Sequence, residues 1–278
     1  MKFAYHTARS LKEAEVVLLG VPDEKGSHAS RKGAAKAPDR IRKVSRERLV
    51  YKRNGKQNLV TVSSGTFKAK LYDMGNVQKR KVKTAVQDIL KVKKKFCVLG
   101  GDHSITAEVL SAFDKPISII YFDAHPDLVC SSKHYYGSVV CDMLLARKLN
   151  VKKSVEIGIR DAETEEIKNF KKFHLLAISS LEVEQKGVEA IWRKIKKHVK
   201  GKVYISIDAD VLDPAEAPGV STPAPGGLRY EQMLFLLKKI LKLNVVGFDI
   251  MEVTPKYDIQ DMTSHLAAKL IAEIASQM

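Results

Sequence analysis

The residues in this chain that could do chemistry begin with an Asp-x-His-x-Asp segment, Asp123, His125 and Asp127, directly after an apolar run at 119–122. Such a run is typical of a buried strand, and side chains two positions apart on an extended backbone point to the same side. Asp123 and His125 can therefore converge on one point, and Asp127 can join them if the chain turns after Pro126. Carboxylates and an imidazole arranged in this way could bind a metal ion, although such residues are also common in loops that bind nothing.

Two other apolar runs end in residues of the same kinds. Residues 96–99 lead into His103, and residues 203–207 lead into Asp208 and Asp210. In an open parallel sheet, ligands bind outside the carboxyl ends of the strands, where these side chains would gather. Three such strand ends together favour a metal centre over three unrelated loops.

The elements that would position these residues alternate between strand and helix. Segments typical of strands lie at 15–22, 71–77, 96–99, 117–122, 154–159, 174–178, 203–207 and 245–250. Segments typical of helices lie at 81–94, 104–113, 142–149, 162–172, 187–199, 231–241 and 263–276, and another helix opens at Ala37 and Pro38. Residues 49–70 are polar and favour β structure without a clear pattern. The alternation predicts a three-layer α/β/α sandwich with a mainly parallel, about eight-stranded sheet. No linker rich in Pro, Gly or Ser divides the chain, so we expect residues 1–278 to form a single domain.

The charge of the chain is strongly positive. Lys and Arg number 48 against 32 Asp and Glu, a formal net charge of +16, which raises the hypothesis of a nucleic-acid binder. The lysines occur in runs such as 93–95 and 194–197, at the spacing of helix faces and loop ends and without interleaved aromatic residues. We therefore expect a solvated basic surface and no nucleic-acid partner.

The cysteines and the N-terminus bear on the cellular compartment. Cys97, Cys130 and Cys141 are too few and too irregularly spaced for a disulfide framework, which predicts reduced thiols in a cytoplasmic protein. Residues 1–9 lack the apolar stretch of a signal peptide, and no segment is typical of a transmembrane span. We expect no membrane partner.

Four ordered motifs resemble those of the ureohydrolase family, which includes arginases and agmatinases, with the greatest similarity to archaeal agmatinase-like members. The motifs are Gly-Gly-Asp-His-Ser at 100–104, Phe-Asp-Ala-His-Pro-Asp at 122–127, Ser-Ile-Asp-Ala-Asp-Val-Leu-Asp-Pro at 206–214 with Ala-Pro-Gly at 217–219, and Asp-Ile-Met-Glu-Val-Thr-Pro at 249–255. Weaker similarities at 20–22, 31–34 and 73–75 extend over nearly the whole chain. The resemblance implies an arginase-like fold and hydrolysis of a guanidino group to urea and an amine.

The resemblance also implies a metal centre with two Mn²⁺ ions per chain. Its ligands would be His103, Asp123, His125, Asp127, Asp208 and Asp210. Carboxylates with two imidazoles suit divalent manganese, and other divalent metals remain open. Six ligands exceed what one ion needs, whereas two ions that share bridging carboxylates use them all. Such a pair lowers the pKa of a shared water, which then attacks the guanidinium carbon.

We also predict roles for three acids outside this ligand set, Glu252, Asp102 and Asp213. By the resemblance, Glu252 would hold the substrate guanidinium through a pair of charge-assisted hydrogen bonds, and Asp127 counts as catalytic as well as a ligand. Asp102 is a candidate for orienting the histidine that follows it. Asp213, just before a proline, is a candidate for closing a turn.

The leaving amine must receive a proton, and at this point the chain departs from the family pattern. Relatives carry a histidine soon after the Asp-x-His-x-Asp segment, where this chain has Tyr136 ahead of Gly137. A phenol with a pKa of about 10 is a poor proton donor near neutral pH. His134 is the candidate replacement, because an imidazole titrates near working pH, and a plain surface position is the alternative.

The substrate is a small guanidino compound, and its identity is the least determined prediction. Arginases recognise the α-carboxylate and α-amine of arginine through an Asn- and Ser-rich loop, which this chain lacks beyond Ser131 and Ser132. That favours agmatine or aminopropylagmatine, giving putrescine or spermidine, with Tyr135 and Tyr136 lining the alkyl chain or packing on a neighbouring subunit.

Arginase activity, formiminoglutamase-type activity and a catalytically silent regulatory relative remain alternatives. Related deacetylases share the fold but bind a single zinc ion, so the presence of His103, Asp127 and the pair Asp208 and Asp210 argues against a deacetylase. The resemblance implies a homotrimer or homohexamer.

Overall fold

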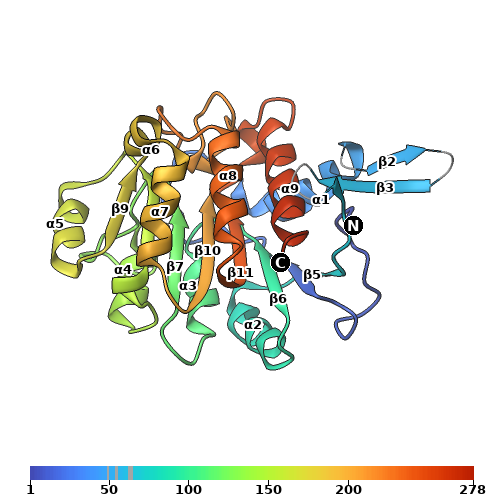
Figure 1. The fold of residues 1–278 in the computed structure, drawn as a ribbon, viewed down its shortest axis with the longest axis horizontal. Coiled ribbons are helices and arrows are strands. Elements are labelled where there is room, and N and C mark those ends of the chain that lie inside the picture. Colours follow the sequence, from blue (N-terminus) through green and yellow to red (C-terminus); the bar gives the residue numbers. More distant parts are fainter. Residues whose placement is uncertain (49, 54–55, 62–64) are drawn as a thin grey trace.

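The computed structural model of the chain describes residues 1–48, 50–53, 56–61 and 65–278 (Figure 1). Its centre is an eight-stranded sheet with the order β5-β1-β6-β11-β10-β7-β8-β9, in which every neighbouring pair is parallel. The strands are β1 (Val16–Gly20), β5 (Leu71–Asn76), β6 (Lys95–Leu99), β7 (Ser118–Phe122), β8 (Val155–Ile159), β9 (Leu176–Ser179), β10 (Lys202–Asp208) and β11 (Asn244–Met251). The predicted parallel sheet is confirmed. A small antiparallel sheet of β2 (Val50–Arg53), β3 (Lys56–Thr61) and β4 (Gly65–Thr66) lies apart from it.

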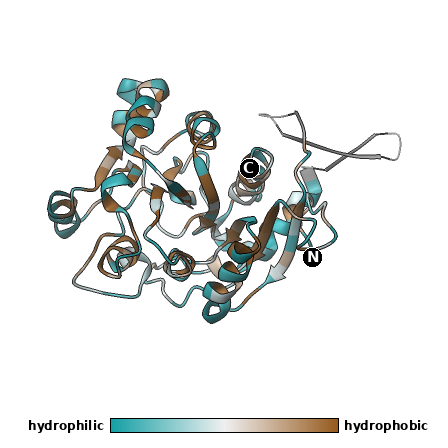
Figure 2. Cartoon of the chain, turned by 60° about the horizontal axis from the view of Figure 1, so that its bottom comes forward, coloured by the Kyte–Doolittle hydropathy of each residue, from teal (hydrophilic) through white to brown (hydrophobic). Residues whose placement is uncertain are grey.

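Helices cover both faces of the large sheet, which completes the predicted three layers. One core is formed with α1 (Ala37–Arg48), α6 (Ser180–Lys186), α7 (Val188–His198), α8 (Tyr230–Ile240) and α9 (Met262–Ala275). The other core is formed with α2 (Val82–Lys91), α3 (Ile105–Ser111), α4 (Val139–Leu145) and α5 (Thr164–Phe173). Figure 2 shows apolar strands enclosed by helices whose outer faces are hydrophilic.

Strand β7 shows why a continuous apolar run was a reliable signal. All five of its residues are buried, with Ile120 and Phe122 in one core and Ile119 and Tyr121 in the other. Alternate side chains of a parallel strand pack under helices on opposite faces, so after Ser118 at its start β7 is apolar until it ends. The first polar residues then emerge at the carboxyl edge.

Many element boundaries differ from the prediction by one to three residues, and three differences are informative. Helix α4 begins three residues earlier than predicted and stops at Leu145, because Arg147 adopts a positive φ of 56° that a helix cannot continue through. His174 is not in a strand but ends α5 in a left-handed conformation. Helix α6 was not predicted at all. Of the polar segment predicted at 49–70, residues 49, 54–55 and 62–64 lie outside the described residues.

The expectation of three reduced thiols is wrong for two of them. Cys130 and Cys141 form a disulfide with their Cα atoms 5.6 Å apart, whereas Cys97 is free and buried. Backbone hydrogen bonds from Val129 N to Gly137 O and from Cys141 N to Asp127 O fold the intervening loop back on itself. The number of residues between the two cysteines does not reveal that the loop folds back in this way. Within the described residues, no helix has the length and apolar character needed to cross a membrane.

Candidate metal centre

Four neighbouring strands of the sheet, β6, β11, β10 and β7, deliver the candidate ligands at their carboxyl ends. The loop after β6 carries His103, the segment after β7 carries three ligands, and β10 ends in Asp208 just before Asp210. Glu252 directly follows β11. Since all four strands run in parallel, their ends meet at one edge, and the structure brings together all six predicted ligands.

The first group of ligands surrounds one ring nitrogen. His103 Nδ1 lies 3.1 Å from Asp123 Oδ2, 3.5 Å from Asp127 Oδ2 and 3.1 Å from Asp208 Oδ2. One nitrogen can donate only one hydrogen bond, so three carboxylates around it are an arrangement suited to a shared cation. Asp123 Oδ2 is buried without a hydrogen bond of good geometry among the described residues.

The second group shares a carboxylate with the first. His125 Nδ1 lies 3.1 Å from Asp210 Oδ2 and 3.5 Å from Asp123 Oδ1. In each of the sets His103, Asp123, Asp127 and Asp123, His125, Asp210, the ligand atoms lie within 4.8 Å of one another. Asp123 therefore offers one oxygen to each group, which is the arrangement of a carboxylate that bridges two ions.

The electrostatics of the centre also favour cations. All four aspartates are buried, and only His125 is partly open, with 27% of its side chain exposed. Burial, followed by the charges of neighbouring carboxylates, raises the pKa of Asp127 and Asp208 well above the usual range. Divalent cations would remove this repulsion, so the donor set fits a metal pair.

A buried hydrogen-bond chain orients His103 from behind. Its Nε2 lies 2.9 Å from Ser206 Oγ, and Ser206 Oγ donates to Asp249 Oδ1 at 2.7 Å. Thr106 and Tyr204 donate to the second oxygen of Asp249 at 2.8 and 2.7 Å. The chain turns Nδ1 toward the carboxylates, a common arrangement for a metal-binding histidine.

Other ligands are also fixed by partners that the sequence analysis did not identify. The Tyr121 hydroxyl donates to Asp127, and Thr222 Oγ1 donates to Asp210 Oδ2 at 3.0 Å. Thr222 stands in the loop after β10, where the sequence gives no signal for it. Tyr121 lies on the same strand as the Asp-x-His-x-Asp segment, so its proximity to the ligands was readable, but its hydrogen bond was not.

The two acids with open roles have structural partners. Asp102 accepts hydrogen bonds from Gly26 N at 2.8 Å and from Ser104 N at 3.0 Å, so it fastens the loop after β1 rather than the ring of His103. Asp213 closes a turn, as predicted, by accepting from Ala215 N at 2.9 Å.

Glu252 lies beside the first group with one free oxygen. Its Oε1 accepts from the backbone N of His103 at 2.8 Å, while Oε2 is buried without a hydrogen bond of good geometry among the described residues, although the side chain of Ser221 also interacts with this carboxylate. Burial raises the pKa of Glu252 to about 7. Glu252 and Asp127 both have positive φ, 61° and 50°, a conformation that non-glycine residues rarely adopt and that occurs preferentially at functional sites.

The structure separates the two candidates for proton transfer. The side chain of His134 is 87% exposed, and its Nδ1 lies 3.8 Å from Asp142 Oδ2. No described contact joins it to the ligands. Tyr136 is half-buried, and burial, followed by the charges of Glu252 and Asp127, raises the pKa of its phenol.

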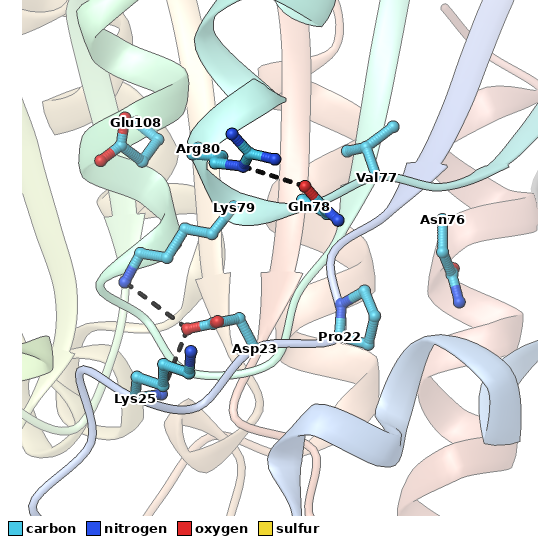
Figure 3. A pocket seen from close by; sticks show the side chains of 9 residues that line it. All are labelled: Pro22, Asp23, Lys25, Asn76, Val77, Gln78, Lys79, Arg80 and Glu108. Atoms are coloured by element: carbon cyan, nitrogen blue, oxygen red, sulfur yellow. Dashed lines mark hydrogen bonds and ion pairs between the residues drawn. The ribbon is translucent and has the colours of Figure 1, made fainter.

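A cavity of about 720 Å³ lies beside the centre rather than in it (Figure 3). None of the six ligands lines it. Lys79, at its wall, donates to Ser104 and lies 4.0 Å from both Asp23 and Asp102, so this lysine separates the cavity from the loop that carries His103.

The fold and the site together define a parallel α/β protein with a candidate two-metal centre at the carboxyl edge of its sheet. The chain belongs to the arginase family, whose model matches residues 14–276. The resemblance to the ureohydrolases is thereby confirmed.

Two similar proteins carry the names of different enzymes, an agmatinase and a proclavaminate amidinohydrolase. The chain is 35% identical to an agmatinase of Blochmanniella floridana, over 93% of this chain and 86% of that protein. It is 31% identical to proclavaminate amidinohydrolase of Streptomyces clavuligerus, over 95% of this chain and 88% of that protein. Among solved structures, the agmatine ureohydrolase of Thermoplasma volcanium superimposes with a TM-score of 0.84 at 28% identity, covering 100% of this chain and 94% of that one.

Proposed function

We propose that this chain hydrolyses agmatine to putrescine and urea. The observation that carries the proposal is the pair of His/Asp groups that share Asp123, with the free Oε2 of Glu252 beside them. Proteins named agmatinase or agmatine ureohydrolase are similar to the chain over nearly its whole length, which supports the choice of substrate.

We further propose that the centre holds two Mn²⁺ ions. The ligands would be His103, Asp123, His125, Asp127, Asp208 and Asp210, with Asp123 shared by both ions. When bound, such a pair supplies a water of lowered pKa for attack on the guanidinium carbon. Oxygen-rich ligand sets with imidazole suit manganese, and the metal content of purified protein tests its identity.

Glu252 would orient the substrate. Its Oε2 is free to accept a hydrogen bond from the planar guanidinium, and its charge would offset that of the cation. Holding the guanidinium carbon in a fixed orientation would lower the barrier by positioning. Asp127, fixed by the Tyr121 hydroxyl, would help to hold the metal pair and would be available to accept a proton.

The departing amine must gain a proton for the reaction to balance. The guanidinium and one water yield urea and an ammonium product, so no other reactant is consumed. The exposed position of His134 gives no support to its predicted role as the donor. Tyr136 is nearer, but its raised pKa makes it a weaker acid than a free phenol, so we propose that solvent water at the mouth delivers the proton.

A product assay tests the proposal. Chain loaded with Mn²⁺ is incubated with agmatine, aminopropylagmatine, arginine and guanidinobutyrate, and with formiminoglutamate for formamide. We expect equimolar urea and putrescine from agmatine, and at least a hundredfold loss of kcat/KM in Glu252→Gln, since a transition-state contact of about 3 kcal/mol corresponds to that factor. Glu189→Gln, on the surface beside Lys239, is the matched control. Loaded protein that releases urea from none of these compounds would be a silent relative.

Three further predictions accompany the proposal. Residues 1–278 would act as one domain, the chain would assemble as a homotrimer or homohexamer, and it would act in the cytoplasm. Light scattering on purified protein tests the assembly, and fractionation of the source cells tests the compartment.

A further inference from the structure

Three aromatic rings from two separate loops gather near the centre, and we call them the aromatic lip: His28, Tyr135 and Tyr136. His28 stacks on Tyr135 with ring centroids 4.9 Å apart and planes at 13°. Tyr136 meets both edge-on, at 6.2 Å from His28 and 5.6 Å from Tyr135. His28 is exposed and the tyrosines are half-buried, so the lip is open to a ligand from solvent.

Backbone hydrogen bonds connect the aromatic lip to the metal centre. Tyr136 N donates to Gly26 O at 3.1 Å, and Gly26 N donates to Asp102, the residue before a metal ligand. The Tyr135 ring lies over Gly137, where an added Cβ would come within 2.9 Å of the ring. Both tyrosines are therefore held in place and cannot be treated as free surface side chains.

Carboxylates act on both tyrosines of the aromatic lip. After burial, the charges of Glu252 and Asp127 raise the pKa of the Tyr136 phenol, and those of Glu163 and Asp127 raise the pKa of the Tyr135 phenol. Two lysines of the loop that carries His28 are directed elsewhere. Lys25 lines the cavity in Figure 3, and Lys32 Nζ donates to Ser27 O at 2.6 Å.

We propose that the aromatic lip binds the terminal ammonium group of the guanidino substrate and so selects a tail that ends in a cation over a tail that ends in a carboxylate. This inference rests on the proposed function. Ring faces attract cations and repel anions through their negative quadrupole. The negative charge of Glu163 also favours a cation over an anion. Glu252 binds the guanidinium end, which leaves the other end of the substrate for the aromatic lip.

The test compares three substrates that share a guanidinium but differ at the far end: agmatine, pentylguanidine with a methyl in place of the ammonium, and 4-guanidinobutyrate. For Tyr135→Leu and His28→Leu, we expect kcat/KM for agmatine to fall about threefold to thirtyfold more than that for pentylguanidine, the range expected for loss of a cation–π contact. Tyr136→Phe keeps the ring and should keep the ratio of the two substrates. Tyr72→Leu removes a ring from another His–Tyr contact, with His6, and is the control.

A second readout separates the inference from the proposed function. Calorimetry measures equilibrium binding of 1,4-diaminobutane and butylamine to the metal-loaded chain and to Glu163→Gln, whose amide can still cap α5. We expect the diamine to bind more tightly than butylamine and to lose part of that advantage in Glu163→Gln and Tyr135→Leu. Equal losses for cationic and neutral tails in both assays would overturn the role of the aromatic lip. Absence of urea from every substrate, with diamine selectivity intact, would instead overturn the proposed function.

Discussion

At the scale of single residues, Asp123 connects the two halves of the metal centre. Its two oxygens lie 3.1 Å from His103 Nδ1 and 3.5 Å from His125 Nδ1, so a change at this residue affects both cation positions. The histidines differ in their surroundings, because His103 is buried and His125 is partly open to solvent. We therefore expect a metal ion held near His125 to exchange with solvent more readily than one held near His103.

The hydrogen-bond chain behind His103 gives a prediction at this scale. Ser206→Ala removes the link between the ring and Asp249, so Nδ1 is less well oriented for metal. We expect affinity for Mn²⁺ at one position to fall about tenfold to a hundredfold, measured by calorimetry on metal-free protein. Ser131→Ala, on the loop surface, is the control. Unchanged affinity in Ser206→Ala would show that packing alone orients His103.

The sequence predicted which side chains converge at the edge of the sheet, but not the residues that hold them, for a physical reason. His103, Asp123 and Asp208 follow apolar strands that must end at one edge of a parallel sheet, so their convergence follows from topology. The contacts from Ser206 to His103 and from Thr222 to Asp210 join residues far apart in the chain or on irregular loops. No periodicity reports such contacts.

At the scale of elements, a buried ion pair joins α1 to β5. Arg42 Nε and Nη2 donate to the two carboxylate oxygens of Asp73 at 2.8 and 2.9 Å, and both side chains are almost fully buried. Burial alone would raise the pKa of Asp73, but the hydrogen bonds and charge of Arg42 lower it. The pair therefore contributes stability at neutral pH.

The sign of its pH dependence follows from the lowered pKa. Because the folded pKa of Asp73 is below the unfolded value of about 3.9, its contribution is present above that value and is lost as the pH falls through the folded pKa. We expect Asp73→Asn to lower the free energy of unfolding by about 3 to 5 kcal/mol at pH 7, since the buried Arg42 loses its bidentate partner and, among the described residues, keeps only the exposed carboxylate of Asp39 as a charged partner.

Denaturant unfolding from pH 7 down to pH 3 measures this effect. The difference between wild type and Asp73→Asn should shrink below about pH 4, where Asp73 begins to protonate in the unfolded chain while it stays ionised in the folded protein. Asp39→Asn, at an exposed carboxylate 3.6 Å from the same arginine, should change stability by less than about 1 kcal/mol. A gap that stays constant with pH would contradict the ionised pair.

The Cys130–Cys141 disulfide gives a second prediction for an element. It closes the loop that carries Tyr135 and Tyr136, and Cys141 N also donates to the backbone O of Asp127. In Cys130→Ser/Cys141→Ser we expect KM for agmatine to rise more than kcat falls, and metal content to be retained. The loop between the two cysteines loses a constraint, whereas the candidate metal ligands lie outside this loop and stay in place. Thermal unfolding should also begin at a lower temperature. An unchanged KM would place the disulfide outside substrate binding.

Helix α6 shows where sequence patterns end. Its seven residues are too few for a periodic signal, and it begins directly after β9, where Ser179 Oγ accepts from Glu182 N as the N-cap. The long amphipathic helices α2 and α7 and the apolar strands were predictable because burial against the sheet imposes a regular pattern. Short helices and closed loops are set by contacts between distant residues.

At the scale of the whole molecule, the net charge and the charge of the site have opposite signs. The chain carries a formal charge of +16, yet four aspartates and Glu252 are buried at one edge of the sheet. Two divalent cations would balance the charge of the four candidate ligand aspartates, so an ionised Glu252 would still leave the pocket attractive to a guanidinium. Local charge at short range decides what binds, because salt screens the surface lysines beyond about 10 Å.

The most direct measurement of the central claim is anomalous scattering from crystals of the chain loaded with Mn²⁺. We expect two peaks at the carboxyl edge of β6, β11, β10 and β7, both about 2.2 Å from oxygens of Asp123, the usual distance for a metal-bound carboxylate. A single peak, or two peaks that do not share Asp123, would contradict the two-metal centre.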